Sequence, residues 1–376
     1  MSWTLSTPVA LHFGEGLFHR LGKIATGQRI MLVTSAGFTR RGLTARVADL
    51  LGNRLIGVLD QVESNPGLTE MDAEALNLRA QRPDQLIAIG GGSVLDTAKV
   101  LTAIVGAPDG WTLARHFAGA APLLDWPSPS LIAVPTTAGT GSEVTPFATV
   151  WDKTAAKKLS LAGPTLLPTL ALLDPELTLD LPEDVGVSTG LDAISQAIES
   201  LWSRKSNAVT EAWSMQALRL ALPTLAQIVV DPRDIKARRA MMEASLLAGL
   251  AISHTRTALA HAMSYPLTAH YGLPHGLACS FTLPAILEFN AQAKDFSPVA
   301  QTLGYGSVAA LQAGLVDLLS RLDVAGRVRR WVPDLGAMTA LVEEMITPGR
   351  SDNNIRQADF DDLRAILGRT QALGLL

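Results

Sequence analysis

The first half of the chain alternates short apolar runs with longer amphipathic stretches. The runs are RIMLVTS at 29–35, LIGVLDQV at 55–62 and QLIAIGGG at 85–92, and helix-like stretches reach to about Leu51 and Ala80. Runs rich in Val, Ile and Leu are typical of strands that are buried on both faces of a parallel sheet. The alternation therefore predicts an α/β fold for this half of the chain.

The pattern changes after Leu173-Asp174-Pro175. From there the β-branched runs stop, and Ala/Leu-rich segments with helical spacing continue nearly to the end. The segment LPEDV at 181–185 is the expected boundary between the two halves. Proline suits the first turn of a helix, and acidic side chains are favoured beside its N-terminus, so a helix should begin here. We expect an α/β domain at 1–180 and an all-helical domain at 181–376. Without a low-complexity linker they should pack directly and leave a cleft, the default place for a site.

Composition and charge exclude several classes of protein. The net charge of −4 over 376 residues comes without a basic stripe that could follow a phosphate backbone. Cys279 is the only cysteine, which excludes an internal disulfide and fits a reducing compartment. No secretory signal is visible, and the apolar runs fall short of the roughly 20 residues that a membrane span needs. We therefore expect a soluble cytoplasmic protein that binds neither nucleic acid nor membrane.

Two turns of small residues follow apolar runs. Gly90-Gly91-Gly92-Ser93 opens a helix-like stretch, and PTTAGTGSE at 135–143 carries the hydroxyls of Thr136, Thr137 and Thr140. Backbone amides at a helix start bind anions such as a pyrophosphate, and hydroxyls can donate to phosphate or ribose oxygens. A three-glycine turn can also be only a tight connection, and the spacing is not GxGxxG. Two such turns at the ends of parallel strands favour a dinucleotide bound across the sheet edge.

Three of the seven histidines fall in one stretch, ALAHAMSYPLTAHYGLPHGLACS at 258–280. His261 lies in a helix-like part of it, and His275 lies in a turn between proline and glycine. Upstream, in GLDAISQAIES, Asp192 and Gln196 are four residues apart and share one helix face. Imidazole and oxygen donors suit a divalent metal, so these four residues are candidate ligands. Each also has an ordinary alternative, since an aspartate can cap a helix and a histidine can be a core residue.

These motifs resemble the iron-dependent (group III) alcohol dehydrogenases over almost the whole chain. The matching segments are GGGSVLDTAK at 90–99, PTTAGTGSEVTPFATV at 135–150, LLDPELT at 172–178, GLDAISQAIES at 190–200, and HAMSYPL with PHG within 261–276. The resemblance implies a dinucleotide-binding α/β domain followed by a helical domain, with a divalent metal, often iron or zinc, in the cleft between them. It also implies a homodimer that reversibly reduces aldehydes or ketones with NAD(P)H.

The residues that the resemblance assigns to the metal are Asp192, Gln196, His261 and His275. Most members have histidine in place of Gln196, and an amide oxygen is a weaker donor than imidazole. Metal affinity should therefore fall, and the preferred ion can change from iron to zinc, manganese or nickel. Tyr265 stands where many members have a histidine thought to relay protons, which makes His275 and Tyr265 the implied catalytic residues. Tyr265 either relays a proton or lines the pocket, and Pro266 should kink or end its helix.

The segments QAIESLW and TRTALAHAMSYPLTAHYGLPHG resemble one branch of the family, the phosphonoacetaldehyde reductases. Members of this branch convert phosphonoacetaldehyde to 2-hydroxyethylphosphonate. The resemblance suggests a substrate-binding role for Arg256, because a guanidinium binds phosphonate oxygens in a bidentate way. The alternative is a surface arginine near the start of a helix.

Cofactor choice depends on the residue after the first strand. In NAD-preferring members an acidic residue there bonds the ribose 2′-hydroxyl and repels a 2′-phosphate. This chain has Ser35, with Arg40 and Arg41 close behind, so NADPH should be tolerated and can be preferred. The other residues at the family's cofactor positions are Asn65, Gly91, Gly92, Ser93, Asp96, Thr136, Thr137, Thr140 and Lys158.

Several alternatives to this function stay open. The chain can be a general short-chain alcohol dehydrogenase, or a maleylacetate-type reductase that works without metal, which Gln196 makes a more serious rival. A dehydroquinate synthase-like lyase would need a cluster of basic residues, and its lysine-rich motifs are not visible. A non-catalytic interaction module is disfavoured because both turns expected to bind the cofactor are intact.

Overall fold

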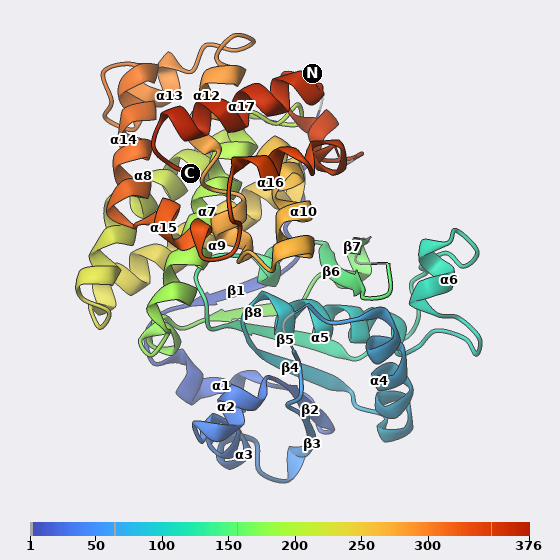
Figure 1. Ribbon diagram of the computed structural model, residues 1–376. Coiled ribbons are helices and arrows are strands. Elements are labelled where there is room, and N and C mark those ends of the chain that lie inside the picture. The colour runs from blue at the N-terminus through green and yellow to red at the C-terminus, as the bar shows by residue number, and fades with distance from the viewer. Residues whose placement is uncertain (1–2, 64, 156, 347) are drawn as a thin grey trace. The chain divides into compact units, whose positions relative to one another are not determined.

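The computed structural model describes residues 3–63, 65–155, 157–346 and 348–376 (Figure 1). The chain forms two compact units. The α/β unit consists of Ser6–Thr137 and Ser142–Thr178, and the helical unit consists of Leu179–Leu376 with residues 3–5 and 138–141. The segment 138–141 leaves the α/β unit because its glycines permit very close packing. A Cβ on Gly139 would lie 2.5 Å from the carbonyl oxygen of Thr189.

The α/β unit is built on a sheet of six strands that all pair in parallel. Their order is β1 (Ala10–Phe13), β8 (Leu170–Leu173), β5 (Ser130–Pro135), β4 (Gln85–Gly90), β2 (Ile30–Val33) and β3 (Leu55–Leu59). The three apolar runs of the first half became β2, β3 and β4, and β2 and β4 are buried throughout. A separate antiparallel pair, β6 (Phe147–Asp152) and β7 (Lys157–Ala162), follows β5. The predicted α/β fold is therefore confirmed.

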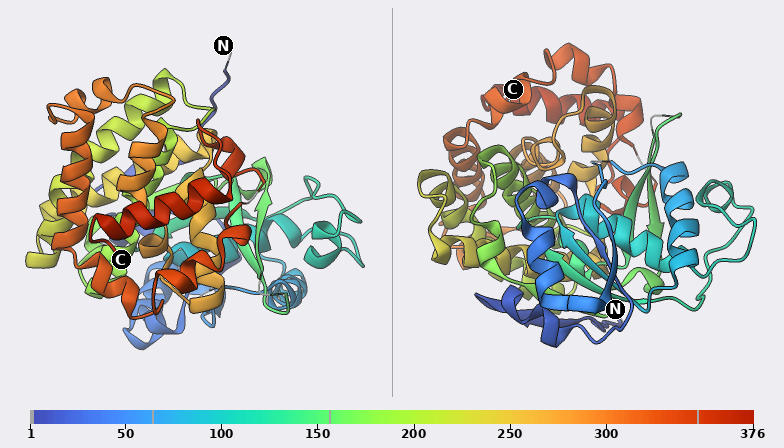
Figure 2. Two further views of the ribbon diagram at one scale, coloured as in Figure 1. Left: turned by 45° about the horizontal axis from the view of Figure 1, so that its top comes forward. Right: turned by 90° about the horizontal axis from the view of Figure 1, so that it is seen from below.

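Helices cover both faces of this sheet (Figure 2). One apolar cluster joins the sheet to α4 and α5, and a second joins its other face to α1 and α3. The helices of this unit are α1 (Leu21–Ile24), α2 (Ala36–Arg40), α3 (Leu43–Leu51), α4 (Leu68–Gln81), α5 (Gly92–Ile104) and α6 (Leu113–Phe117). The sheet is thus held between helical layers, and its strand ends remain available for turns.

The helical unit contains no strand among its described residues, as the sequence predicted. Its helices are α7 (Glu183–Leu201), α8 (Ala208–Val230), α9 (Ile235–Thr255), α10 (Leu259–Tyr271), α11 (His275–Ala278), α12 (Leu283–Asn290), α13 (Ser297–Thr302), α14 (Val308–Arg321), α15 (Val324–Arg329), α16 (Leu335–Thr339) and α17 (Phe360–Ala372). Helix α7 packs against α8, α9 and α11, and its residues from 190 to 201 are all buried. Throughout the described ranges, no helix is both long and apolar enough to span a bilayer.

Pro266 was expected to kink or end its helix; it does not end it, and a kink at this residue stays a prediction. Helix α10 continues past Pro266 to Tyr271. A proline inside a helix removes one backbone hydrogen bond, and here the side chains of Pro266 and Leu267 are both buried, which helps to offset that loss. The helix ends instead at Gly272, whose φ of 70° is the left-handed conformation that glycine adopts readily.

A single glycine lets α11 approach α7. A Cβ on Gly276 would lie 1.7 Å from the carbonyl oxygen of Ser188 and 3.1 Å from the amide nitrogen of Asp192. No side chain fits in that space, so only glycine allows this approach. The contact brings His275, the neighbour of Gly276, to the part of α7 that carries Asp192.

We predict that Gly276→Ala destabilises the helical unit by about 1–3 kcal/mol or more, because α11 has to move away from α7. The matched control is Gly368→Ala in α17, where a Cβ meets nothing within 4 Å. Alanine inside a helix is favoured over glycine, so the control should be neutral or stabilising. Thermal unfolding checks both variants. A Gly276→Ala protein as heat-stable as the parent would contradict this account of the packing.

Candidate metal centre and active site

Three of the four predicted metal ligands converge in the helical unit. One potential ligand atom from each of Asp192, His261, His275 and Cys279 lies within 4.8 Å of the others. Asp192 comes from α7, His261 from α10 and His275 from the start of α11, so three separate helices build the site. His261 Nε2 lies 3.3 Å from Asp192 Oδ1, and both side chains are buried. Such a set of oxygen and imidazole donors suits a divalent metal.

Gln196, the fourth predicted ligand, lies one turn beyond Asp192 on α7 and is buried. Its Nε2 donates to the carbonyl oxygen of Thr140 at 3.3 Å. Its Oε1, by contrast, has no hydrogen-bond partner within the part of the chain that the structure describes. A buried acceptor without a donor costs free energy, and a cation would satisfy it. The residues therefore fit a metal ion, and Gln196 Oε1 as one of its donors stays a prediction.

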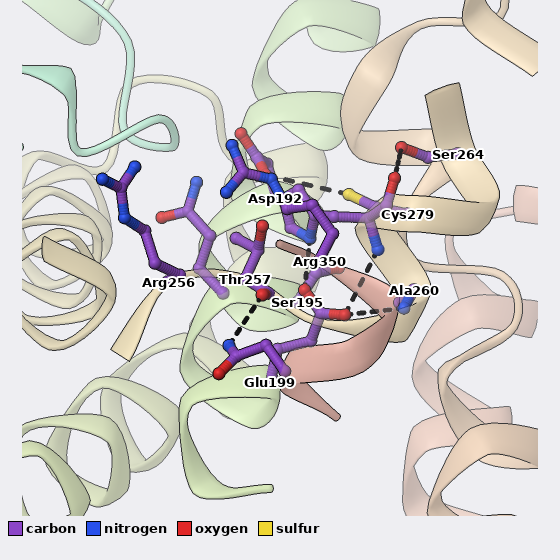
Figure 3. Close-up of polar contacts among 12 residues, drawn as sticks. Asp192, Ser195, Glu199, Arg256, Thr257, Ala260, Ser264, Cys279 and Arg350 are labelled. Atoms are coloured by element: carbon purple, nitrogen blue, oxygen red, sulfur yellow. Dashed lines mark hydrogen bonds and ion pairs between the residues drawn. The ribbon is translucent and has the colours of Figure 1, made fainter. Parts of the chain in front are cut away.

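Glu199 is a residue of this site that the sequence reasoning missed. It is fully buried, and Oε2 accepts a hydrogen bond of 2.5 Å from His261 Nδ1 while Oε1 accepts from the amides of Ala260 and His261 at 2.6 and 3.2 Å (Figure 3). A bond at Nδ1 leaves Nε2 of His261 facing Asp192, which is the arrangement that orients metal-binding histidines. The sequence spacing could have identified Glu199, because it lies seven residues after Asp192 and therefore on the same helix face.

The two carboxylates dominate the electrostatics of His261. Burial by itself lowers the pKa of this imidazole, but the negative charges and hydrogen bonds of Glu199 and Asp192 outweigh burial and raise the pKa to about 10. The same pair of carboxylates that favours a proton on His261 also favours a divalent cation beside it.

Cys279 also lies at the site and was not predicted as part of it. Its Sγ lies 3.7 Å from Asp192 Oδ1 and 3.6 Å from the carbonyl oxygen of Gly276, either of which can accept its single S–H proton, and the residue is fully buried (Figure 3). The thiol therefore already has acceptors, whereas Gln196 Oε1 has no donor. By position Cys279 is a further candidate ligand beside Asp192, His261 and His275, and Gln196 as the fourth ligand stays a prediction.

Tyr265 connects the histidines to two arginines. Its ring lies 6.3 Å from the ring of His275 at an interplanar angle of 25°, and its hydroxyl accepts a bond of 2.9 Å from Arg350 Nε. Arg256, at the C-terminal end of α9, interacts electrostatically with both Tyr265 and Arg350. Burial, followed by the positive charge of Arg350, lowers the pKa of Arg256. Arg350 lies far away in the sequence, in no motif, and was not predicted.

The two predicted dinucleotide-binding turns lie side by side in the α/β unit. Strand β4 ends at Gly90, Gly91 caps α5, and the amide of Thr136 donates to the carbonyl oxygen of Gly90 at 3.0 Å. A Cβ on Gly91 would lie only 3.3 Å from Thr137 Cγ2. The sheet edge therefore presents partly exposed glycine backbone at residues 91 and 92 beside two threonines, as an anion site requires.

The remaining predicted cofactor residues are spread around this edge. Ser35 caps α2 directly after β2, Asn65 has a φ of 60°, and Lys158 lies on β7. Thr140 belongs to the helical unit. Asp60, at the end of β3, was not predicted, and it accepts a bond of 2.6 Å from Thr39 of α2.

Asp96 supports the second turn from within the protein. Its two oxygens accept bonds from Ser142 Oγ at 2.5 Å and from the amide of Thr149 at 2.7 Å. The fully buried Lys99 adds bonds from Nζ to the carbonyl oxygens of Ser142 and Phe147. Helix α5 thereby holds the start of β6 in place. A direct contact between Asp96 and a cofactor stays a prediction.

Comparison with known proteins identifies the family. The model for iron-containing alcohol dehydrogenases matches residues 8–175, and the model for their C-terminal domain matches residues 186–370. The chain belongs to the iron-containing alcohol dehydrogenases. The predicted family and fold are thus confirmed, and the protein is an oxidoreductase of the alcohol dehydrogenase type. The predicted cofactor classes, a nicotinamide dinucleotide and a divalent metal, are those of this family.

Individual relatives within the family act on different small molecules. Phosphonoacetaldehyde reductase of Streptomyces viridochromogenes is 36% identical over 92% of this chain and 91% of its own length. The 1,3-propanediol dehydrogenase of Klebsiella pneumoniae is 30% identical over 90% of each chain. The solved structure of sulfoacetaldehyde reductase from Bifidobacterium kashiwanohense, in complex with NAD⁺, has a TM-score of 0.91 at 31% identity and covers 98% of this chain and 99% of its own.

We predict that Glu199→Gln lowers the affinity for the metal by about 10- to 100-fold, because His261 loses the carboxylate that orients it. Competition with a chelator of known affinity measures the effect without an activity assay. Glu344→Gln is the matched control, since Glu344 pairs with His270 Nε2 at 2.8 Å in a partly exposed position. A folded Glu199→Gln protein with the parent's metal affinity would contradict the assigned role.

Proposed function

We propose that this enzyme reduces a small aldehyde that carries an anionic group to a primary alcohol, using NAD(P)H. The best candidate substrate is phosphonoacetaldehyde, with 2-hydroxyethylphosphonate as the product. The observation that carries the proposal is the half-buried Arg256, which interacts with Tyr265 beside the predicted ligand His275. A guanidinium in that place recognises a phosphonate, and the phosphonoacetaldehyde reductase relative supports the same reading.

In this proposal Asp192, Gln196, His261 and His275 hold the divalent ion, which when bound supplies Lewis-acid chemistry at the carbonyl group. The glycine turn at Gly91 and the threonines at 136 and 137 would bind the nicotinamide cofactor, which when bound would supply hydride-transfer chemistry. Glu199 keeps the His261 imidazole in its orientation throughout the reaction.

Tyr265 is the side chain best placed to handle the proton. Hydride addition makes the carbonyl oxygen strongly basic, and a phenol next to it can donate its proton. Arg350 Nε, which bonds to the Tyr265 oxygen, stabilises the phenolate that remains. The hydroxyl of Tyr265 thus takes the place of the histidine that many family members have at this position.

A second candidate substrate is sulfoacetaldehyde, which is also a small aldehyde with an anionic group. The structural similarity to sulfoacetaldehyde reductase supports this candidate. Both compounds are two-carbon aldehydes with an anionic head group, but a sulfonate has one negative charge and a phosphonate can have two. The metal-independent alternative is disfavoured by Gln196 Oε1, which lacks a donor among the described residues. A cytoplasmic location and a homodimer stay predictions.

We predict that the reconstituted enzyme prefers phosphonoacetaldehyde over propanal by about 10- to 100-fold in kcat/KM, because bonds to charged groups contribute about 1.5–3 kcal/mol. The assay compares phosphonoacetaldehyde, sulfoacetaldehyde and propanal, with NADH and with NADPH. The protein is loaded with iron, zinc, manganese or nickel, and the chelator-treated protein should be inactive. A preference for propanal, or full activity without metal, would contradict the proposal.

A further inference from the structure

We propose that Arg256 and Arg350 together bind the anionic group of the substrate, and that the segment 350–353 positions both guanidinium groups. The inference rests on the proposed function, because it assigns the residues that distinguish an anionic aldehyde from a neutral one. It also extends that function, since it assigns a second cation and predicts a preference for two negative charges over one.

Arg256 and Arg350 are linked through the segment 350–353, because Asn353 bonds to the carbonyl oxygens on both sides of Arg256 and lies three residues after Arg350. The pKa of Arg256 is lowered first by burial and then by the positive charge of Arg350. Both residues are half-buried, and in Figure 3 their side chains extend toward the same side of the site. Arg350 bonds to a neutral group, the hydroxyl of Tyr265, at 2.9 Å. An anion that reaches both guanidinium groups interacts favourably with two positive charges in partly buried surroundings.

The backbone at Arg256 is strained in a way that is typical of ligand-binding residues. Its φ of 63° and ψ of 171° lie in a region that is essentially restricted to glycine. An arginine in this conformation destabilises the fold unless the surrounding structure holds it. Helix α9 ends here, and the strained residue turns the chain toward α10.

Asn353 is the side chain that holds this conformation. Its Nδ2 donates to the carbonyl oxygen of Thr255 at 2.8 Å and to that of Thr257 at 3.0 Å, so it bonds to both neighbours of Arg256. Its Oδ1 accepts a bond of 3.1 Å from Ser203 Oγ, which fixes the amide in turn. All three of these side chains, those of Asn353, Ser203 and Thr255, are buried. The short helix at Ser351–Asn353 therefore clamps the backbone on both sides of Arg256.

The same segment supplies Arg350. This residue lies three positions before Asn353, and its Nε bonds to Tyr265 next to His275. One short segment thus places one arginine directly and holds the other through Asn353. Each guanidinium can give two parallel N–H donors to the oxygens of a phosphonate. A dianion neutralises both charges, a sulfonate neutralises one, and a neutral aldehyde neutralises none.

The test compares Arg350→Met and Arg256→Met with the exposed control Arg329→Met in α15. The quantity measured is the ratio of kcat/KM for phosphonoacetaldehyde to kcat/KM for propanal. Damage to Tyr265 alone slows both substrates equally and leaves the ratio unchanged, so the ratio isolates anion binding. We expect the ratio to fall by about 10- to 100-fold in each arginine variant and to stay constant in the control. An unchanged ratio in Arg350→Met would overturn the proposal.

A binding measurement separates this inference from the proposed function. Methylphosphonate, titrated calorimetrically into the metal- and cofactor-loaded parent, should bind, and binding should weaken at least tenfold in Arg350→Met. If methylphosphonate behaves in this way but phosphonoacetaldehyde is a poor substrate, the anion site stands and the substrate assignment fails. If phosphonoacetaldehyde is the preferred substrate of the parent and Arg350→Met binds methylphosphonate normally, the substrate assignment stands and the role of Arg350 fails.

The strain at Arg256 gives a second, independent readout. Arg256→Gly removes the side chain and relieves the backbone, whereas Arg256→Met removes the charge and keeps the strain. The glycine variant should unfold at a higher temperature than the methionine variant, although both lose the preference for phosphonate. Asn353→Ala should lower the same kcat/KM ratio by releasing Arg256. Equal thermal midpoints for the glycine and methionine variants, or a parental ratio in Asn353→Ala, would contradict the clamp.

Discussion

The site depends on one buried carboxylate, that of Glu199. It accepts three hydrogen bonds from the beginning of α10, two from backbone amides and one from the His261 ring. A buried charge is tolerated only when such partners surround it, so α10 is held at this point of α7 and in this orientation. The remaining ligands follow from the same contact, because His261 then faces Asp192. Loss of this carboxylate would therefore loosen the whole donor set.

Helix α7 is the element on which the donors are assembled. Asp192, Gln196 and Glu199 share one face of it, and two close approaches complete the site around that face. Gly276 admits α11 with His275, and Gly141, at a φ of 61°, lets the segment 138–141 reach Gln196. A Cβ on Gly141 would lie 2.4 Å from the Cα of Gly249. Small residues thus determine which side chains can meet here.

The sequence predicted those parts of the site that lie in regular or family-specific patterns. Asp192 and Gln196 were found from helical spacing, and His261 and His275 from their motifs. Glu199 lies on the same face at the next turn but was not recognised, because a glutamate in a helix is usually exposed. Arg350 could not have been found, since its position near Tyr265 depends on how residues 350–353 pack against α9. The expectation that Pro266 could end its helix was wrong, because burial in α10 helps to compensate for the lost hydrogen bond.

Anomalous diffraction from crystals of the zinc- or iron-loaded protein, recorded on both sides of the absorption edge, tests the metal site most directly. The account predicts one strong peak, bound by Asp192, Gln196 Oε1, His261 Nε2 and His275, with Glu199 still bonded to His261 Nδ1. An ion held by Cys279 Sγ in place of Gln196, or the absence of any peak at these residues, would contradict it.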